Sequence, residues 1–158
     1  RLLVVADNCD DGTARIAAAA GAETLVRADP ARRGKGYALQ HALDALRDAP
    51  PSVAVFIDAD CRLQPGALAR AAGLAEASSR PAQMLYLMRA PEGAGPQRSV
   101  AAFAWLLMND VRMSGLFRLF DVCRLTGSGM ALPWSVAGGL DLASGEIVED
   151  LALSTPAG

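Results

Sequence analysis

Two carboxylates, one residue apart, follow the most strand-like apolar stretch of the chain. Residues 53–57 read Val-Ala-Val-Phe-Ile, and Asp58 and Asp60 come directly after them. A turn with this spacing aims both carboxylates at one hard cation, and such oxygen ligands suit Mg²⁺ or Mn²⁺ shared with substrate phosphates. The spacing therefore predicts a divalent metal site. Two acids that only solvate a loop are the alternative.

The elements that must hold these carboxylates alternate between strand and helix. We expect strands at 2–6, 23–27, 53–57 and 83–88, and helices at 14–20, 35–47 and 65–76. Apolar residues at helical spacing in 35–47 indicate a face that packs on a sheet. This βαβαβαβ order predicts an α/β fold with a mostly parallel sheet. Ligands of such sheets bind at the carboxyl ends of the strands, where Asp58 and Asp60 lie.

The second half of the chain has a different pattern. A loop rich in Gly and Pro at 91–96 precedes an expected helix at 100–119, with apolar residues on several faces. We expect this helix to be core, with contact to a membrane or to another part of the protein as the alternative. After a short strand at 122–125, the loop Gly127-Ser128-Gly129 would let a substrate approach the backbone closely.

Composition excludes several classes of protein. The 158 residues, about half of them hydrophobic, predict one globular domain, and the net charge of −2 argues against binding to nucleic acid. The longest strongly apolar run, 100–108, is less than half of the ~20 residues that a membrane-spanning helix needs. Three cysteines without a Cys-X-X-Cys pair argue against a disulfide scaffold and a zinc site, and indicate core or near-core residues of a reducing compartment.

Five features follow one another in an informative order. They are the acidic turn at Asp7, the helix start Gly34-Lys35-Gly36, Asp58-Ala59-Asp60, the loop Gly127-Ser128-Gly129-Met130, and the helix start Glu149-Asp150-Leu151. This series resembles the family 2 glycosyltransferases, inverting enzymes of the GT-A fold that transfer a sugar from a nucleotide donor. The stretch 125–134 is most similar to membrane-associated members that build polysaccharides or glycolipids.

The resemblance implies a Rossmann-like GT-A domain over 1–158, with a nucleotide-binding half at 1–90 and an acceptor-binding half at 91–158. It implies inverting transfer from a nucleotide-diphosphate sugar, usually a UDP-sugar, to a carbohydrate or lipid-linked acceptor, in the cytoplasm at the inner face of the cell membrane. The family's first strand and its Gln/Arg-X-X-Arg-Trp motif are absent from this sequence. We therefore expect an N-terminally truncated piece of a longer protein, whose other segments supply any membrane contact.

The resemblance also assigns donor-binding roles. Asp60 is the principal metal ligand, Asp58 assists it and approaches the ribose, and Asp7 accepts hydrogen bonds from the nucleobase or ribose. Lys35 opens a helix, where its ammonium and the exposed N–H groups suit a phosphate. The alternatives are a turn or helix-capping acid at Asp7 and a solvated surface lysine at Lys35.

The acceptor hydroxyl must lose a proton, and the resemblance assigns that general base to Asp150, with Glu149 as a cap or supporting partner. Acids that complement a helix dipole are the alternative for this pair. Trp134 is expected either to form the floor of an acceptor-sugar site or to be an ordinary buried tryptophan. His41, the only histidine, is expected to be a surface or packing residue.

Three other functions compete. A haloacid-dehalogenase-like phosphatase also places Asp-X-Asp after an apolar strand, with the first Asp as nucleophile, but Arg62 stands where that pattern needs Thr or Val. A sugar-phosphate nucleotidyltransferase needs a Gly-rich motif near its N-terminus, which this sequence lacks. A non-catalytic nucleotide-binding module would use the same pocket without turnover.

Overall fold

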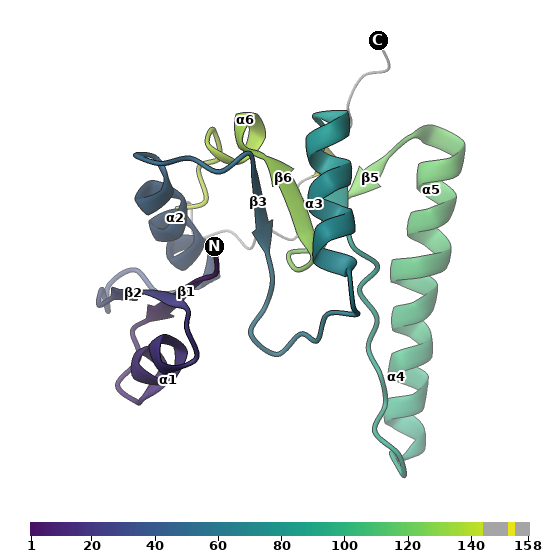
Figure 1. Cartoon of the computed structure of the whole chain (residues 1–158). Helices are drawn as coiled ribbons and strands as arrows, with labels where there is room; N and C mark the ends of the chain where they lie inside the picture. Colours follow the sequence, from purple (N-terminus) through teal and green to yellow (C-terminus); the bar gives the residue numbers. More distant parts are fainter. Residues whose placement is uncertain (144–151, 154–158) are drawn as a thin grey trace. The chain divides into compact units, whose positions relative to one another are not determined.

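The structure is a computed structural model in which residues 1–143 and 152–153 are described (Figure 1). Its elements in chain order are β1 (Leu3–Asp7), α1 (Thr13–Ala19), β2 (Glu23–Arg27), α2 (Lys35–Leu46), β3 (Val53–Phe56), α3 (Ala67–Ser78), β4 (Ala82–Gln83), α4 (Pro96–Leu106), the π-helical turn η1 (Leu107–Val111), α5 (Arg112–Phe120), β5 (Cys123–Arg124), β6 (Met130–Pro133), α6 (Trp134–Ala137) and β7 (Ala152–Leu153). Within these described ranges, no helix combines the length and the apolar character needed to cross a membrane.

The chain divides by its contacts into two compact units. The first unit contains Arg1–Pro51 and the segment that begins at Trp134, and the second contains Ser52–Pro133 and strand β7. The elements confirm the α/β class and the expected alternation of strand and helix through α3.

In the first unit, β1 and β2 pair in parallel, from Leu3 opposite Glu23 to Asp7 opposite Arg27. Helices α1 and α2 both contact this pair. Ala6 of β1 and Leu43 of α2 are each only 1% exposed, so this face of α2 packs inward as the sequence predicted. The parallel direction places Asp7 and Arg27 side by side at the carboxyl ends of their strands.

In the second unit, β6 lies between β3 and β4 and is antiparallel to both. Figure 1 shows β6 beside β3. Strands β3 and β4 therefore run in the same direction, as a βαβ order requires, but both pairings within this sheet are antiparallel. The sequence pattern predicts no strand at 130–133. All four of these residues are buried, so the stretch carries no alternation that would distinguish a strand from buried loop.

The expected strand at 83–88 is much shorter than predicted. Its pairing with β6 ends at Gln83, opposite Met130, and the N–H of Met84 donates to the carbonyl of Gly129 at 2.8 Å. Beyond this point the chain leaves the sheet, because β6 begins at Met130 and offers no further partner. Tyr86 instead contacts the long helical segment, where the indole N–H of Trp105 donates to its carbonyl at 3.0 Å.

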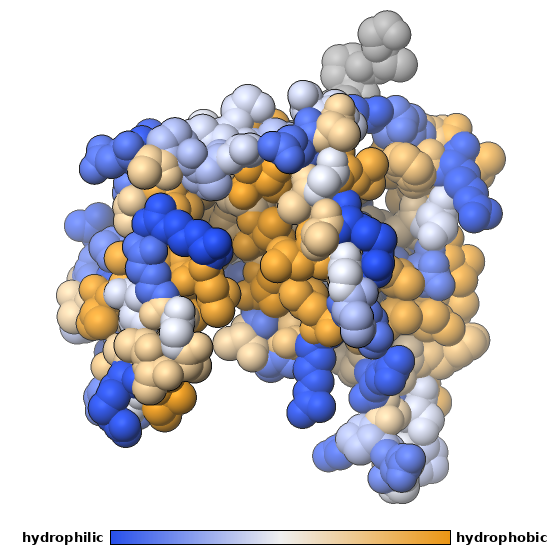
Figure 2. Space-filling model, in the orientation of Figure 1, coloured by the Kyte–Doolittle hydropathy of each residue, from blue (hydrophilic) through white to orange (hydrophobic). Residues whose placement is uncertain are grey.

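The helical segment 96–120 runs through α4, η1 and α5. None of its residues is buried, and large apolar side chains such as Val100, Phe103 and Phe120 are more than half exposed. The expectation that this helix is core is therefore wrong for the described part of the chain. Figure 2 shows apolar side chains among the charged ones on the surface of this unit.

Candidate functional site

The acidic turn, residues 58–61, lies at the carboxyl end of β3. The strand ends at Phe56, and the N–H of Cys61 donates to the carbonyl of Asp58 at 3.0 Å, which closes the turn. The ligand atoms of Asp58, Asp60 and Cys61 all lie within 4.8 Å of one another. Asp60 is exposed, and the other two residues are half-buried. The structure thus brings the two predicted carboxylates together at a strand end.

The Gly-rich loop, residues 126–129, lies against this turn. Ser128 is only 2% exposed, and its Oγ accepts a hydrogen bond from the N–H of Asp58 at 3.0 Å and contacts Sγ of Cys61 at 3.3 Å. One residue later, the N–H of Gly129 donates to the carbonyl of Phe56 at 2.8 Å. These bonds connect the Gly-rich loop to the end of β3 and to the start of the acidic turn.

Gly129 has a positive φ of 75°, and a Cβ built there would lie 3.0 Å from Cβ of Met84. A side chain at this position would therefore be strained in its backbone and would collide with the neighbouring strand end. The loop needs glycine here so that its backbone can pass between the ends of β3 and β4.

The donor set of the acidic turn fits a hard divalent cation. Mg²⁺ and Mn²⁺ are typically held by one or two carboxylates, with the remaining positions filled by water and substrate phosphates. Asp58 and Asp60 supply such oxygens, whereas Sγ of Cys61 is a soft ligand that already contacts Ser128. The two carboxylates are therefore the residues that would hold the metal.

Tyr86 is a neighbour of the acidic turn that no motif in the sequence marks. Partial burial, a side-chain hydrogen bond with Cys61, and the negative charges of Asp60 and Asp58 raise the pKa of its phenol above the usual value. Its ring meets the ring of Trp105 edge-on, with centroids 5.5 Å apart. The sequence offered only an aromatic residue in a strand-like run, which is a weak signal.

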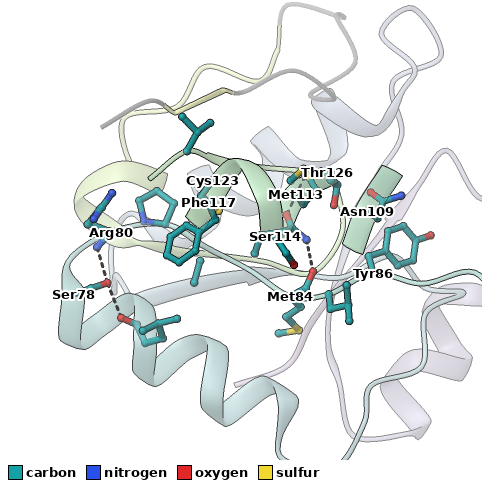
Figure 3. A pocket seen from close by; sticks show the side chains of 16 residues that line it. Ser78, Arg80, Met84, Tyr86, Asn109, Met113, Ser114, Phe117, Cys123 and Thr126 are labelled. Atoms are coloured by element: carbon teal, nitrogen blue, oxygen red, sulfur yellow. Dashed lines mark hydrogen bonds between the residues drawn. The ribbon is translucent and has the colours of Figure 1, made fainter. Parts of the chain in front are cut away.

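A mainly apolar cavity of about 340 Å³ lies in the second unit beside β4 (Figure 3). Met113 and Phe117 of α5 and Leu74 of α3 contribute to its wall. Figure 3 shows Tyr86 at one end of the cavity and Arg80 at the other. The cavity therefore extends from Tyr86, which neighbours the acidic turn, along α5.

In the first unit, Asp7 is paired with Arg27. The guanidinium Nη1 of Arg27 donates to Oδ1 of Asp7 at 2.6 Å, and the amide of Asn8 donates to the same oxygen at 3.2 Å. Arg27 also donates to Asp29 at 3.0 Å and lies 5.6 Å from the ring centre of Tyr37. The side chains of the Asp7–Arg27 pair are 17% and 11% exposed. Arg27 was missed because nothing in the sequence marks its pairing with Asp7 across the strands.

The other predicted residues are placed as follows. Lys35 is exposed and opens α2 behind Gly34, as expected, and Trp134 is half-buried at the start of α6. His41 lies in α2 and is half-buried. Glu149 and Asp150 lie outside the described residues. Cys9 is exposed, so the expectation that all three cysteines are core or near-core is wrong for this one.

The structure thus forms one cluster from the acidic turn and the Gly-rich loop, whereas Asp7, Lys35 and Trp134 belong to the other unit. The family model described as "Glycosyltransferase like family 2" matches residues 1–155. The fold is accordingly α/β of the GT-A class. The chain belongs to the family 2 glycosyltransferases and is a glycosyltransferase. No curated protein and no solved structure matches it significantly.

Proposed function

We propose that this glycosyltransferase moves a sugar, with inversion at the anomeric carbon, from a nucleotide-diphosphate sugar to an acceptor hydroxyl. UDP is the preferred nucleotide. The observation that carries the proposal is the acidic turn: two carboxylates with converging ligand atoms, held at a strand end by a buried serine. Family membership favours this reaction over the phosphatase alternative.

The acidic turn would bind the donor diphosphate together with Mg²⁺ or Mn²⁺. Asp60 would be the principal ligand, with Asp58 assisting it and approaching the ribose. When bound, the cation stabilises the negative charge that develops on the departing diphosphate. In the first unit, Asp7 would accept hydrogen bonds from the nucleobase or ribose through its carboxylate, held in place by Arg27, and Lys35 would attract a phosphate.

In the transfer step, the acceptor oxygen forms a bond to the anomeric carbon while the bond from that carbon to the diphosphate breaks. The acceptor proton passes to Asp150 as general base, and the nucleoside diphosphate leaves. Glu149 would support Asp150. The Gly127–Gly129 backbone and Trp134 would contact the donor or acceptor sugar.

The acceptor would be a carbohydrate or a lipid-linked sugar, and the enzyme would act in the cytoplasm at the inner face of the cell membrane. The similarity of 125–134 to membrane-associated members of the family supports this location. The exposed apolar residues of α4, η1 and α5 also support it, because such residues are suited to a partner surface of low polarity.

A thermal-shift panel tests the proposal. The protein is heated with UDP, GDP and dTDP, each with and without Mn²⁺, and Mn²⁺ alone serves as the control. A ligand at 100 times its Kd stabilises the folded state by about 2.7 kcal/mol. We expect the largest shift with UDP and Mn²⁺ together. If no nucleoside diphosphate raises the melting temperature in the presence of Mn²⁺, the proposal fails.

A further inference from the structure

Gln83, the last residue of β4, connects the Gly-rich loop to the sheet through both ends of its side-chain amide. Its Oε1 accepts a hydrogen bond from the N–H of Thr126 at 3.0 Å. Its Nε2 donates to the carbonyl of Ser128 at 2.8 Å and to the carbonyl of Met84 at 2.9 Å. An N–H on one side and two carbonyls on the other fix the orientation of this amide.

The Gly-rich loop that Gln83 bonds to is the same loop that bonds to the acidic turn. Ser128 receives the Gln83 bond on its carbonyl oxygen and uses its Oγ to accept the N–H of Asp58. The backbone of Gly129 bonds to Met84, the residue after β4, and to Phe56 of β3, at 2.8 Å in both cases. A path of hydrogen bonds therefore runs from the Gln83 amide through Ser128 to the backbone N–H of Asp58, the first residue of the acidic turn.

The side-chain bonds in this path are part-buried, and Gln83 itself is half-buried. A donor or acceptor that is shielded from water is costly to leave without its partner, so loss of the Gln83 amide should weaken the hold on the loop. Without the amide, the N–H of Thr126 would lose its acceptor, and the carbonyl of Ser128 would keep only the longer bond from Oγ1 of Thr126, at 3.5 Å.

We propose that Gln83 is a positioning residue for the donor site: its amide holds the Gly-rich loop so that Ser128 sets the acidic turn for the metal-bound diphosphate. This inference rests on the proposed function. Gln83 acts through the loop and contacts no reacting atom. Its loss should loosen the acidic turn while leaving the rest of the fold in place.

Gln40 provides a matched control. It also bridges distant parts of the chain, since its Oε1 accepts the N–H of Leu142 at 2.8 Å and its Nε2 donates to Asp44 at 2.9 Å. Gln40 belongs to the other unit and has no bond to the acidic turn. Gln83→Met and Gln40→Met thus remove the same functional group from two bridging glutamines of similar kind.

The first readout is the reactivity of Cys61 towards N-ethylmaleimide in the protein without metal or nucleotide. Cys61 contacts Ser128, so a loosened loop should expose its thiol. Peptide mass spectrometry follows each cysteine separately, and the exposed Cys9 is the internal reference. We expect alkylation of Cys61 to rise about tenfold in Gln83→Met, the effect of losing a part-buried hydrogen bond, and to stay unchanged in Gln40→Met.

The second readout is donor kinetics and Mn²⁺-dependent UDP binding. We expect Gln83→Met to raise the donor KM about tenfold with a smaller change in kcat, whereas Gln40→Met leaves both unchanged. Gln83→Glu keeps the acceptor for Thr126 and places an oxygen against two carbonyls, so it should resemble Gln83→Met.

The outcomes test the positioning role of Gln83 separately from the proposed function. Unchanged Cys61 alkylation in Gln83→Met, or an equal increase in Gln40→Met, overturns the role of Gln83 whatever the reaction is. Increased Cys61 alkylation with an unaltered donor KM also overturns it, because the turn would then move without consequence for the donor. If the wild-type protein binds no nucleotide with Mn²⁺, the proposed function fails instead, and the alkylation result still reports on the link between Gln83 and the turn.

Discussion

The backbone N–H of Asp58 donates a hydrogen bond to Oγ of Ser128, 3.0 Å away and 70 residues later in the chain. This bond joins two stretches that the sequence marks for separate reasons, the strand-end carboxylates and the Gly-rich loop. Because Ser128 is 2% exposed, water does not replace it as the acceptor. The orientation of the acidic turn therefore depends on a hydroxyl that contributes no ligand to a metal itself.

Ser128→Ala should destabilise the protein, because it removes the hydroxyl that accepts the part-buried hydrogen bond from the N–H of Asp58. We expect the free energy of unfolding to fall by about 1–3 kcal/mol, measured by urea denaturation. Ser99→Ala, on the exposed side of α4, is the control and should change stability by less than about 0.5 kcal/mol. If the two substitutions lowered the free energy of unfolding equally, the Ser128 hydroxyl would have no special part in stability.

The position of Asp58 and Asp60 was predictable because a short apolar run followed by carboxylates is a local pattern. The partner of Asp58 was not, since it depends on β6, and β6 is a four-residue buried stretch without strand periodicity. The roles of Gln83 and Arg27 were also hidden. Each depends on which backbone or carboxylate lies opposite it across a strand, and this register is set by tertiary packing rather than by local sequence.

Arg27→Leu should leave the carboxylate of Asp7 without its cationic partner in a site that is mostly out of water. The pair is 11% and 17% exposed, so we expect a loss of roughly 1–3 kcal/mol or more in the free energy of unfolding. The control is Arg47→Leu. Arg47 pairs with Asp44 at 3.1 Å with both side chains more than half exposed, and such pairs contribute about 0.2–1 kcal/mol. Thermal and urea denaturation of both variants would contradict the prediction if Arg47→Leu were the more damaging change.

Tyr86 should titrate above its usual pKa of 10.0, because partial burial, the contact with Cys61 and the nearby carboxylates all disfavour the phenolate. The folded state then holds this proton more tightly than the unfolded state. The resulting stability is present below pH 10.0 and is lost as the pH rises through the higher pKa of the folded state. Absorbance at 295 nm measures this titration, and the chain has only two tyrosines. The difference between wild type and Tyr86→Phe isolates Tyr86, and a midpoint at or below 10.0 would contradict the raised pKa.

Asp60→Asn should abolish Mn²⁺-dependent nucleotide binding while leaving the fold intact. Asp60 is exposed at the end of a strand, so its side chain has little part in the core, but an amide is a much poorer ligand for a hard cation. Calorimetric titration with UDP in the presence of Mn²⁺ measures the affinity. Asp48→Asn, at an exposed position of the first unit, is the control and should bind normally. Unchanged UDP affinity in Asp60→Asn would remove Asp60 from the metal site.

Asp150→Asn should keep donor and metal binding and lose transfer, because an amide of similar shape does not accept the acceptor's proton at neutral pH. The loss expected for a general base is on the order of 10²–10⁴-fold in turnover. Glu149→Gln should cost less if Glu149 only supports its neighbour. If Asp150 were instead a helix N-terminal acid, its replacement would lower stability by roughly 0.3–1 kcal/mol and leave turnover per folded molecule nearly unchanged. Melting temperature and transfer rate measured on the same preparation distinguish the two roles, and a normal rate in a slightly less stable protein would exclude Asp150 as the base.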